Sequence, residues 1–301
     1  MSIFGLFGKP QKAKHLHLEE ALKNPKHIGE DYAVMEKYDG WYMYIDCING
    51  VWQTIKSKTG RDLPSMDKYT KLFQASRGTS LDCRLIFEAT IPGMVFKDLN
   101  GRFNQKKEAL EGVVIKAHDV LVHKYPHKIF SARYSNLQAV VEHCELQSFV
   151  DIVEILAVSS DKDVWMKHYD HITSQPNGEG VILKRMNGKY SADARNHDLM
   201  KIKCELTLDL VVVDVERGEG KYAQTLGRLV VQDAKGLKNS VSGMSDLERD
   251  EWWACPESII GCVVEVKAMR ALKNGSLREG RFKAVRWNKS EDEIDSIADY
   301  M

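Results

Sequence analysis

The stretch Val34-Met35-Glu36-Lys37-Tyr38-Asp39-Gly40-Trp41 decides how the rest of this sequence is interpreted. The apolar runs 32–35 and 41–45 on either side of Lys37 are each typical of a strand. Asp39-Gly40 between them favours a β-hairpin, so we expect Lys37 at the end of a strand, held by a sheet. A lysine held in this way can act as a nucleophile when some of it is the free amine. An ordinary edge-strand lysine is the alternative, and these residues alone favour it.

Length and composition indicate a two-domain globular chain. Its 301 residues are enough for two cores, and 43% hydrophobic with 29% charged residues is typical of a soluble protein. The formal net charge is zero, so total charge indicates no acidic partner. The six cysteines form no CxxC pair, which favours reduced thiols in a cytoplasmic compartment. No run approaches the roughly 20 apolar residues of a membrane span, and the first ten residues lack a signal peptide's apolar core.

Up to about residue 204, strand-like and helix-like runs alternate. Helices are expected at 18–23, 67–75, 131–145 and 161–172. Strands are expected at 51–55, 81–91, 113–122, 149–158, 178–185 and 199–204. In the last of these, Lys201 and Lys203 alternate with apolar residues and should point to one face. The basic segment 1–14 is expected to be loosely held.

Beyond residue 204 short strand-like runs dominate, at 208–216, 226–232, 259–269 and 282–287. One helix is expected at 245–253, where Ser245 and Glu248 fit a capping box. About five short strands with one helix suit a small β-barrel such as an OB-fold. The predicted class is therefore α+β, with a mixed domain of antiparallel sheets and helices at 1–204 and a barrel at 205–301.

A set of charged residues interrupts otherwise apolar runs. Its members are Lys37, Glu88, Asp119, Glu179, Lys184, Lys201 and Lys203. Desolvating a charge without a partner costs several kcal/mol, so these residues need either solvent or one another. One interpretation places them all on a solvated sheet face. The other gathers them in one cleft suited to a polyphosphate and its metal.

In their order along the chain, these residues resemble the motifs of the covalent nucleotidyltransferases, which include DNA ligases, RNA ligases and mRNA capping enzymes. The matching segments are Lys37-Tyr38-Asp39-Gly40 (the KxDG motif), Phe87-Glu88, Ala117-His118-Asp119, Glu179-Gly180-Val181-Ile182-Leu183-Lys184, Lys201-Ile202-Lys203 and Arg281-Phe282-Lys283-Ala284-Val285-Arg286-Trp287-Asn288-Lys289. Together they resemble a compact ATP-dependent DNA ligase of the bacteriophage kind, with an adenylation domain and an OB domain.

Five positions depart from the family pattern. The arginine usual two residues after the KxDG glycine is Tyr42, and the arginine of the following loop is Lys58, with Arg61 close by. The aromatic residue that stacks on the purine is His118. Phe87 and Asn288 stand where glycine and aspartate are usual.

The resemblance implies that Lys37 attacks the α-phosphorus of ATP and forms lysyl-AMP. The AMP then passes to the 5′-phosphate of a nick in duplex DNA, and the 3′-hydroxyl seals the strand. Lys184, Lys201 and Lys203 would neutralise phosphate, and Glu88 would bind the ribose. Glu179 would position Mg²⁺, while Asp39 would either orient the metal's waters or fix the turn. The implied nucleotide site also includes Glu36, Lys58, Arg61, His118, Arg286 and Lys289.

Several residues keep a plainer interpretation. Lys58 and Arg61 could be only a solvated loop, and Asp119 could be a buried acid that caps a neighbouring loop. Arg133 and Arg195 are interpreted as surface cations like any others.

DNA contact is expected mainly through the phosphate backbone, because a nick sealer must accept any sequence. Cations that could make it gather late in the chain, at Lys267, Arg270, Lys273, Arg278, Arg281, Lys283, Arg286 and Lys289. The acidic run 291–295 is expected to be a solvated end. The protein is expected to act as a monomer. Alternatives are an RNA ligase, a GTP-using capping-type enzyme, or a non-catalytic OB-fold that binds nucleic acid.

Overall fold

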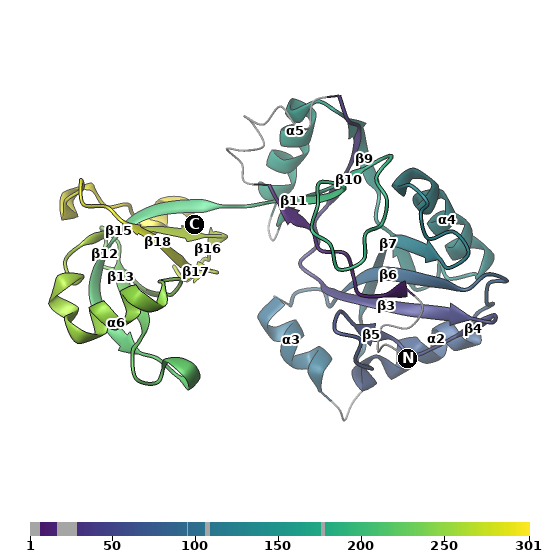
Figure 1. The fold of residues 1–301 in the computed structure, drawn as a ribbon, viewed down its shortest axis with the longest axis horizontal. Coiled ribbons are helices and arrows are strands. Elements are labelled where there is room, and N and C mark those ends of the chain that lie inside the picture. The colour runs from purple at the N-terminus through teal and green to yellow at the C-terminus, as the bar shows by residue number, and fades with distance from the viewer. Residues whose placement is uncertain (1–6, 17–28, 95, 106–108, 176–177) are drawn as a thin grey trace. The chain divides into compact units, whose positions relative to one another are not determined.

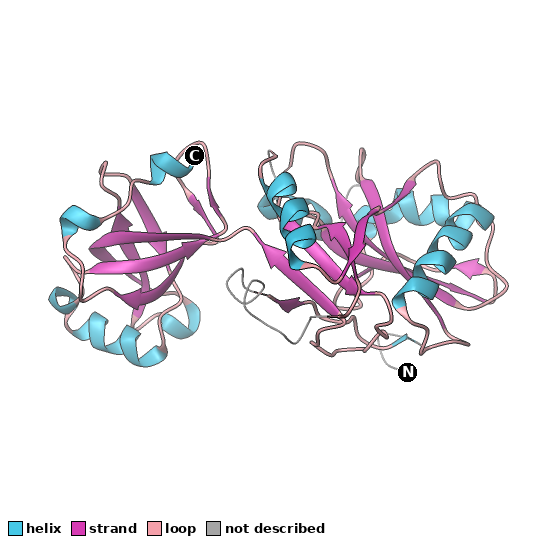
Figure 2. Cartoon of the chain, turned by 90° about the horizontal axis from the view of Figure 1, so that it is seen from above, coloured by secondary structure: helices cyan, strands magenta, loops and turns pink. Residues whose placement is uncertain are grey.

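The structure is a computed structural model that describes residues 7–16, 29–94, 96–105, 109–175 and 178–301. The chain divides into two compact units, Met1–Lys203 and Cys204–Met301 (Figures 1 and 2). The boundary predicted from the sequence lies one residue from this division. In the described part of the chain, each helix is too short or too polar to cross a membrane.

Unit 1 is built on two sheets (Figure 1). The first sheet has the strand order β1 (Lys14–His15), β11 (Leu199–Lys203), β10 (Gly180–Arg185), β2 (Tyr32–Glu36) and β9 (Ile155–Ser159). The second has the order β4 (Val51–Trp52), β3 (Trp41–Ile48), β6 (Cys83–Thr90), β7 (Val114–Val122) and β8 (Val150–Ile152), with β5 (Lys56–Ser57) also on β3. The pairs β1–β11 and β7–β8 are parallel, and the others are antiparallel.

Helices cover one face of each sheet. Side chains of α2 (Asp67–Ala75), α3 (Phe96–Asn104) and α4 (Phe130–His143) form one core with β3, β6 and β7 (Figure 1). Trp165 and Tyr169 of α5 (Lys162–Thr173) pack on the first sheet, against the alternate strand residues Val34, Val181, Leu183, Met200 and Ile202. Because strand side chains alternate, the residues between these point to the opposite face of that sheet. That face carries Lys184, Lys201 and Lys203.

The predicted hairpin around Asp39-Gly40 is wrong. β2 pairs with β9 and β10, whereas β3 pairs with β4, β5 and β6, so residues 37–40 cross from one sheet to the other. Gly40 does not adopt a positive φ, and a Cβ there would lie 2.8 Å from Glu88 Cβ. Glycine is therefore needed for close approach to β6 rather than for a turn. The hairpin lies further on, where Asn49 (φ 51°) and Gly50 (φ 79°) join β3 to β4.

Of the other local predictions, four helices are confirmed and one strand is corrected. The helices expected at 67–75, 131–145, 161–172 and 245–253 are confirmed as α2, α4, α5 and α6 (Asp246–Ala254), while the one at 18–23 lies outside the described residues. The single strand expected at 149–158 is wrong, because the chain changes sheet between β8 and β9.

The described part of the N-terminal segment is not loosely held. The backbone amide of Gln11 donates to the Tyr190 hydroxyl (2.9 Å), and Gly8 O accepts from Arg84 Nη1 (2.9 Å). Lys14 and His15 form β1 against β11. Residues 7–15 are therefore part of the packed structure of unit 1, which corrects the sequence expectation.

Unit 2 is a closed antiparallel barrel. Its strand order is β14 (Lys238–Val241), β13 (Leu226–Gln232), β12 (Leu206–Arg217), β15 (Val263–Ala268) and β18 (Arg281–Val285). A parallel bridge from Ser242 to Arg281, with Phe282 N donating to Ser242 O (2.9 Å), joins the two ends of this order. α6 connects β14 to β15 and begins with the predicted capping box, in which Glu248 N donates to Ser245 Oγ (3.3 Å). The fold class is α+β with an OB-fold barrel, as predicted.

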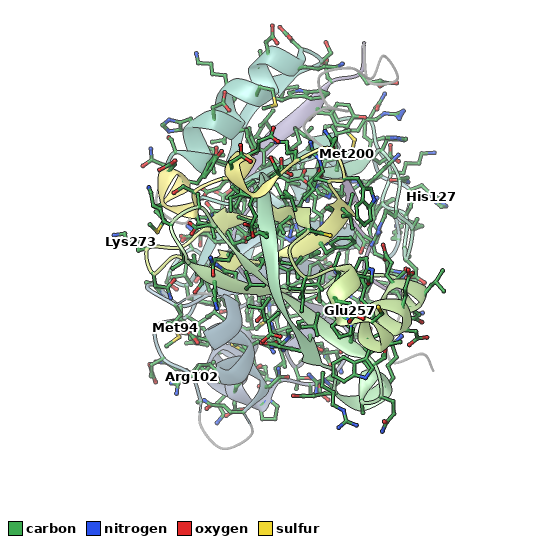
Figure 3. All side chains as sticks on the ribbon, turned by 90° about the vertical axis from the view of Figure 1, so that its left-hand side faces the viewer. Met94, Arg102, His127, Met200, Glu257 and Lys273 are labelled. Carbon is green, nitrogen blue, oxygen red and sulfur yellow. The ribbon has the colours of Figure 1, made fainter. Side chains whose placement is uncertain are left out.

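The C-terminal segment packs on the barrel instead of forming a solvated end. Asp295 N donates to Asp209 O, and Ile297 is fully buried in the barrel core. Within the acidic run 291–295, residues 291–293 are exposed and residues 294 and 295 are half-buried. A second hairpin, β16 (Arg270–Ala271) and β17 (Leu277–Arg278), carries Lys273 on its exposed turn (Figure 3).

Candidate active site

Lys37 follows β2 directly and is held by both its backbone and its side chain. Lys37 N donates to Gly180 O at 3.0 Å, which extends the β2–β10 ladder by one residue. Its ammonium contacts the carboxylate of Glu179, whose side chain is only 3% exposed. At Gly180, φ is 130° and a Cβ would collide with Ile202 O, so glycine is required beside this glutamate. The strand end that the sequence predicts for Lys37 is confirmed, although the hairpin is not.

Three carboxyl groups gather around this lysine. Asp39 hydrogen bonds to Glu179, and burial raises the pKa of Glu179 against the opposing effect of Lys37. Burial raises the pKa of the half-buried Glu88 to about 8; Lys37 and Lys58 oppose this rise, and Glu179 and Asp39 add to it. Within the described residues, no group of three or more His, Cys, Asp or Glu side chains is arranged to hold a metal.

Cations concentrate beside Lys37. In the β10–β11 ladder, Lys201 faces Ile182 and Lys203 faces Gly180, which places both lysines on the sheet face away from α5. Burial, together with the like charges of Lys203, Lys37, Lys58 and Arg195, lowers the pKa of Lys201 to about 8. An anion bound here would relieve this repulsion. Arg195, interpreted from the sequence as an ordinary surface cation, belongs to this cluster.

Lys184 lies in a different environment from the other lysines. Its side chain is 6% exposed, and Nζ lies 2.7 Å from His118 O, 3.2 Å from His118 Nδ1 and 3.1 Å from Asp119 Oδ2. An ammonium has three N–H donors, and these three acceptors use them all. The sequence predicts a phosphate contact for Lys184, but the structure uses its donors within the protein.

A β-bulge explains how His118 and Asp119 both reach this site. The β6–β7 register shifts between Ile86, which faces Asp119, and Phe87, which faces Ala117. His118 is the extra residue, so two successive side chains point away from the α2–α3–α4 core. Arg133, interpreted from the sequence as a surface cation, is instead buried and makes two hydrogen bonds to Asp119 (2.9 and 3.1 Å). Burial raises the pKa of Asp119, but Lys184 and Arg133 outweigh it and hold this pKa well below its usual range.

Three further residues predicted for the nucleotide site, Lys58, Arg61 and Glu36, make different contacts. Lys58 Nζ is 5.9 Å from the ring centre of Tyr42, which itself faces Glu88 across the β3–β6 ladder. Arg61 instead donates to Asn104 Oδ1 of α3 (2.7 Å), and Glu36 hydrogen bonds to the Tyr38 hydroxyl. The contacts of Arg61 and Glu36 therefore point them away from the lysine cluster.

The two barrel cations that the resemblance adds to the site are paired within unit 2. Arg286 Nη1 lies 3.1 Å from Asp209 Oδ1 and 3.2 Å from Glu265 Oε2, and Lys289 Nζ lies 2.7 Å from Asp209 Oδ2. Asp209 is itself buried in β12. Asp209 of β12, which is separated from β18 by β15, therefore pairs with both cations, and Glu265 of β15 adds a second partner for Arg286.

A two-sheet domain with a lysine at the end of a strand, followed by an OB-fold barrel, defines the nucleotidyltransferase class. Residues 10–203 match the model of the ATP dependent DNA ligase domain, and the chain belongs to this family.

Individual relatives agree with this assignment. A DNA ligase of Methanospirillum hungatei is 40% identical over 73 residues, which cover 24% of this chain and 13% of that protein. DNA ligase 1 of Korarchaeum cryptofilum is 26% identical over 271 residues, which cover 79% of this chain and 49% of that protein. The chain thus spans at most about half the length of these two relatives. A solved structure from a structure-function study of Lig E DNA ligases has a TM-score of 0.70 at 21% identity, covering 92% of this chain and 99% of that one.

Proposed function

We propose that this protein is an ATP-dependent DNA ligase that seals nicks between a 5′-phosphate and a 3′-hydroxyl in duplex DNA. The observation that carries the proposal is the placement of Lys37. It stands at a strand end against the buried Glu179 and beside the Lys201 and Lys203 cations. Membership of the ligase domain family and the similarity to DNA ligases support the choice of substrates.

In the first step, the free amine of Lys37 forms a bond to the α-phosphorus of ATP, and the bond to the pyrophosphate oxygen breaks. Lys201, Lys203 and Lys58 would neutralise phosphate charge. The like charges of Lys203 and Lys58 lower the pKa of Lys201, and a bound anion would offset this repulsion. The AMP then moves to the 5′-phosphate of the nick. Attack by the 3′-hydroxyl on that phosphate expels AMP and joins the strand.

The donor set beside Lys37 fits Mg²⁺. Asp39 and Glu179 offer carboxylate oxygens, which Mg²⁺ prefers, and this ion usually binds one or two carboxylates together with phosphates and waters. When bound, the ion would neutralise charge on the phosphates. Glu88, facing Tyr42, is placed to accept a hydrogen bond from the ribose once it is ionised or to donate one while neutral.

Unit 2 would bind the phosphate backbone of DNA through exposed cations such as Lys273, Arg281 and Lys283. We infer that the protein works as a monomer in a reducing, cytoplasmic compartment, in keeping with its six free cysteines. Arg286 and Lys289 would exchange their acidic partners for nucleotide phosphate during the first step.

A nick-sealing assay tests this proposal and separates it from the alternatives. Duplexes with one labelled 5′-phosphate at a nick are prepared with either DNA or RNA strands, and each is supplied with ATP or GTP. We expect joined product with DNA strands and ATP. Efficient joining only of RNA strands would identify an RNA ligase, and dependence on GTP would indicate capping-type chemistry. Nucleotide-independent binding without joining would favour a binding module.

A further inference from the structure

The Lys184–His118 contact has a consequence for how the base is bound. Lys184 Nζ is surrounded by His118 O, His118 Nδ1 and Asp119 Oδ2, and it also lies 4.8 Å from the ring centre of Phe130. A lysine ammonium can only donate hydrogen bonds. The imidazole nitrogen that it contacts must therefore be an acceptor, and the ring proton must sit on the other nitrogen.

From this geometry we infer that Lys184 is a positioning residue, which holds His118 as the neutral imidazole with its proton on Nε2 and so makes that N–H available as a hydrogen-bond donor to a bound purine. The inference rests on the proposed function for the identity of the ligand, a purine nucleotide. His118 would then meet the purine as an uncharged ring that also donates one hydrogen bond. A phenyl ring at this position could only stack.

Charged groups from three elements reinforce this state of His118. Lys184 comes from β10, Asp119 from β7 and Arg133 from α4, while the Tyr42 ring of β3 lies 6.1 Å from the imidazole. Burial, followed by the charge of Lys184, lowers the pKa of His118 to about 3, against the opposing effect of Asp119. The ring therefore stays neutral throughout the physiological range, unlike an exposed histidine.

The structure also explains why Lys184 cannot readily be replaced by another cation. Its three acceptors surround one nitrogen, whereas the donors of arginine are spread over a planar fork. Asp119 keeps its two bonds to Arg133 without Lys184, so the carboxylate would remain paired after substitution. The expected consequence of Lys184→Met is release of the His118 ring rather than loss of the fold.

NMR of the ligand-free protein tests the tautomer directly and needs no variant to fold. Imidazole ¹⁵N–¹H spectra are recorded from pH 5 to 9, and the His118 signal is identified by its loss in His118→Phe. We expect a proton on Nε2, none on Nδ1, and no titration in this range. In Lys184→Met burial still keeps the ring neutral, but Nδ1 loses its donor, so we expect the ring proton to be shared between the two nitrogens instead of confined to Nε2. A proton on Nδ1, or titration near pH 6.5 in the wild type, would overturn the inference.

A double-mutant cycle tests whether Lys184 acts through His118. Formation of lysyl-AMP is measured for Lys184→Met, His118→Phe and the double variant, with Lys116→Met as the matched control, a half-buried lysine of β7 paired with Asp151. We expect Lys184→Met to raise the KM for ATP roughly tenfold with little change in kcat. In the His118→Phe background, Lys184→Met should raise the KM for ATP by less than about twofold.

Equal losses of kcat from Lys184→Met in both backgrounds would show that the lysine acts on phosphate, and would contradict the inference. Absence of any adenylation in the wild type would refute the proposed function instead. In that case the NMR experiment would still decide the positioning of His118, so the two failures can be told apart.

Discussion

The two units of this protein differ in the number of their charged residues and in how these residues are paired. Unit 1 has 29 Lys and Arg residues against 25 Asp and Glu, whereas unit 2 has 14 against 18. In unit 1 the neighbours that shift the pKa of Lys201 are all cations. In unit 2 the motif cations Arg286 and Lys289 each meet Asp209. The zero net charge of the chain therefore conceals an excess of cations in unit 1 and an equal excess of acids in unit 2.

Unit 1 itself contains both kinds of arrangement. The buried Asp119 is balanced by Lys184 and Arg133, and it supports the fold near His118. Lys201 of β11 lies instead among like charges that lower its pKa, and an incoming polyphosphate would stabilise this group of cations. The difference teaches that paired charges in this cleft position other residues, while concentrated like charges mark the place for the ligand.

The largest expected effect follows from removing the balanced acid in unit 1. Asp119→Ala would leave Lys184 and Arg133 buried without their carboxylate, and we expect a loss of about 3–5 kcal/mol in the free energy of unfolding. Urea denaturation would measure it. Asp151→Ala, which removes an exposed carboxylate paired with Lys116, should cost no more than about 1 kcal/mol. Similar losses in the two variants would contradict the structural role of Asp119.

The effect of Asp119 also has a pH dependence with a defined sign. Because its pKa is held well below the usual value, its contribution to stability is present at neutral pH. That contribution should be lost as the pH falls below about 4, the pKa of an ordinary aspartate. In Asp119→Ala, the free energy of unfolding should therefore fall less than in the wild type as the pH is lowered below 4.

A smaller effect is expected when the balanced acid of unit 2 is neutralised. Asp209→Asn removes one of the two carboxylates that contact the guanidinium of Arg286, while Glu265 remains. We expect the free energy of unfolding to fall by about 1–2 kcal/mol. Thermal unfolding would measure it, with Asp299→Asn as a control in which an exposed pair with Lys235 is removed. No difference between the two variants would show that Asp209 does not organise these cations.

The unbalanced site should respond to pH through Lys201. With its pKa near 8, Lys201 loses its charge as the pH rises from 7 to 9, so the Kd for ATP should increase about tenfold over that range. Lys201→Arg stays charged and should abolish most of this change, whereas Lys203→Arg should retain it. Calorimetric titration at pH 7, 8 and 9 would measure the Kd. An unchanged pH dependence in Lys201→Arg would assign the effect to another group.

The smallest expected effect concerns Glu88. Its pKa of about 8 lies above the usual value for glutamate, so the folded state binds the proton more tightly and stability should fall as the pH rises from about 4.5 to 8. Glu88→Gln carries no charge at any pH. At pH 9 we expect it to be more stable than the wild type by on the order of 1 kcal/mol after solvent screening, about 2–4 °C in Tm. The exposed Glu142→Gln should show no gain.

Sequence predicts element identity here better than element pairing. Apolar periodicity and the capping box located α2, α4, α5 and α6, because these signals are local. The partners of β2 and β3 depend on contacts between distant segments, and the Asp39-Gly40 signal gave no information on them. Gly40 is explained by its close approach to β6, where Glu88, Ala89 and Thr90 lie about 50 positions further along the chain.

The same limit applies to the candidate site. The motifs predicted that Lys37, Glu179, Lys201 and Lys203 act together, and in the structure each lies on a strand of the first sheet or directly beside one, with Lys37 in contact with Glu179. They could not show that a bulge in β7 turns both His118 and Asp119 toward Lys184, since the bulge is set by the pairing with β6. Arg133 was missed because nothing in a helical sequence shows which arginine is buried.

The central claim is that Lys37 becomes covalently attached to AMP. The protein is incubated with Mg²⁺ and ATP labelled at the α-phosphate, denatured, and examined for label on the chain, alongside Lys37→Ala and after pyrophosphate treatment to remove AMP already bound. We predict label on the wild type that passes to nicked DNA, and none on Lys37→Ala. A wild-type chain that stays unlabelled after pyrophosphate treatment, or a labelled Lys37→Ala, would contradict the account.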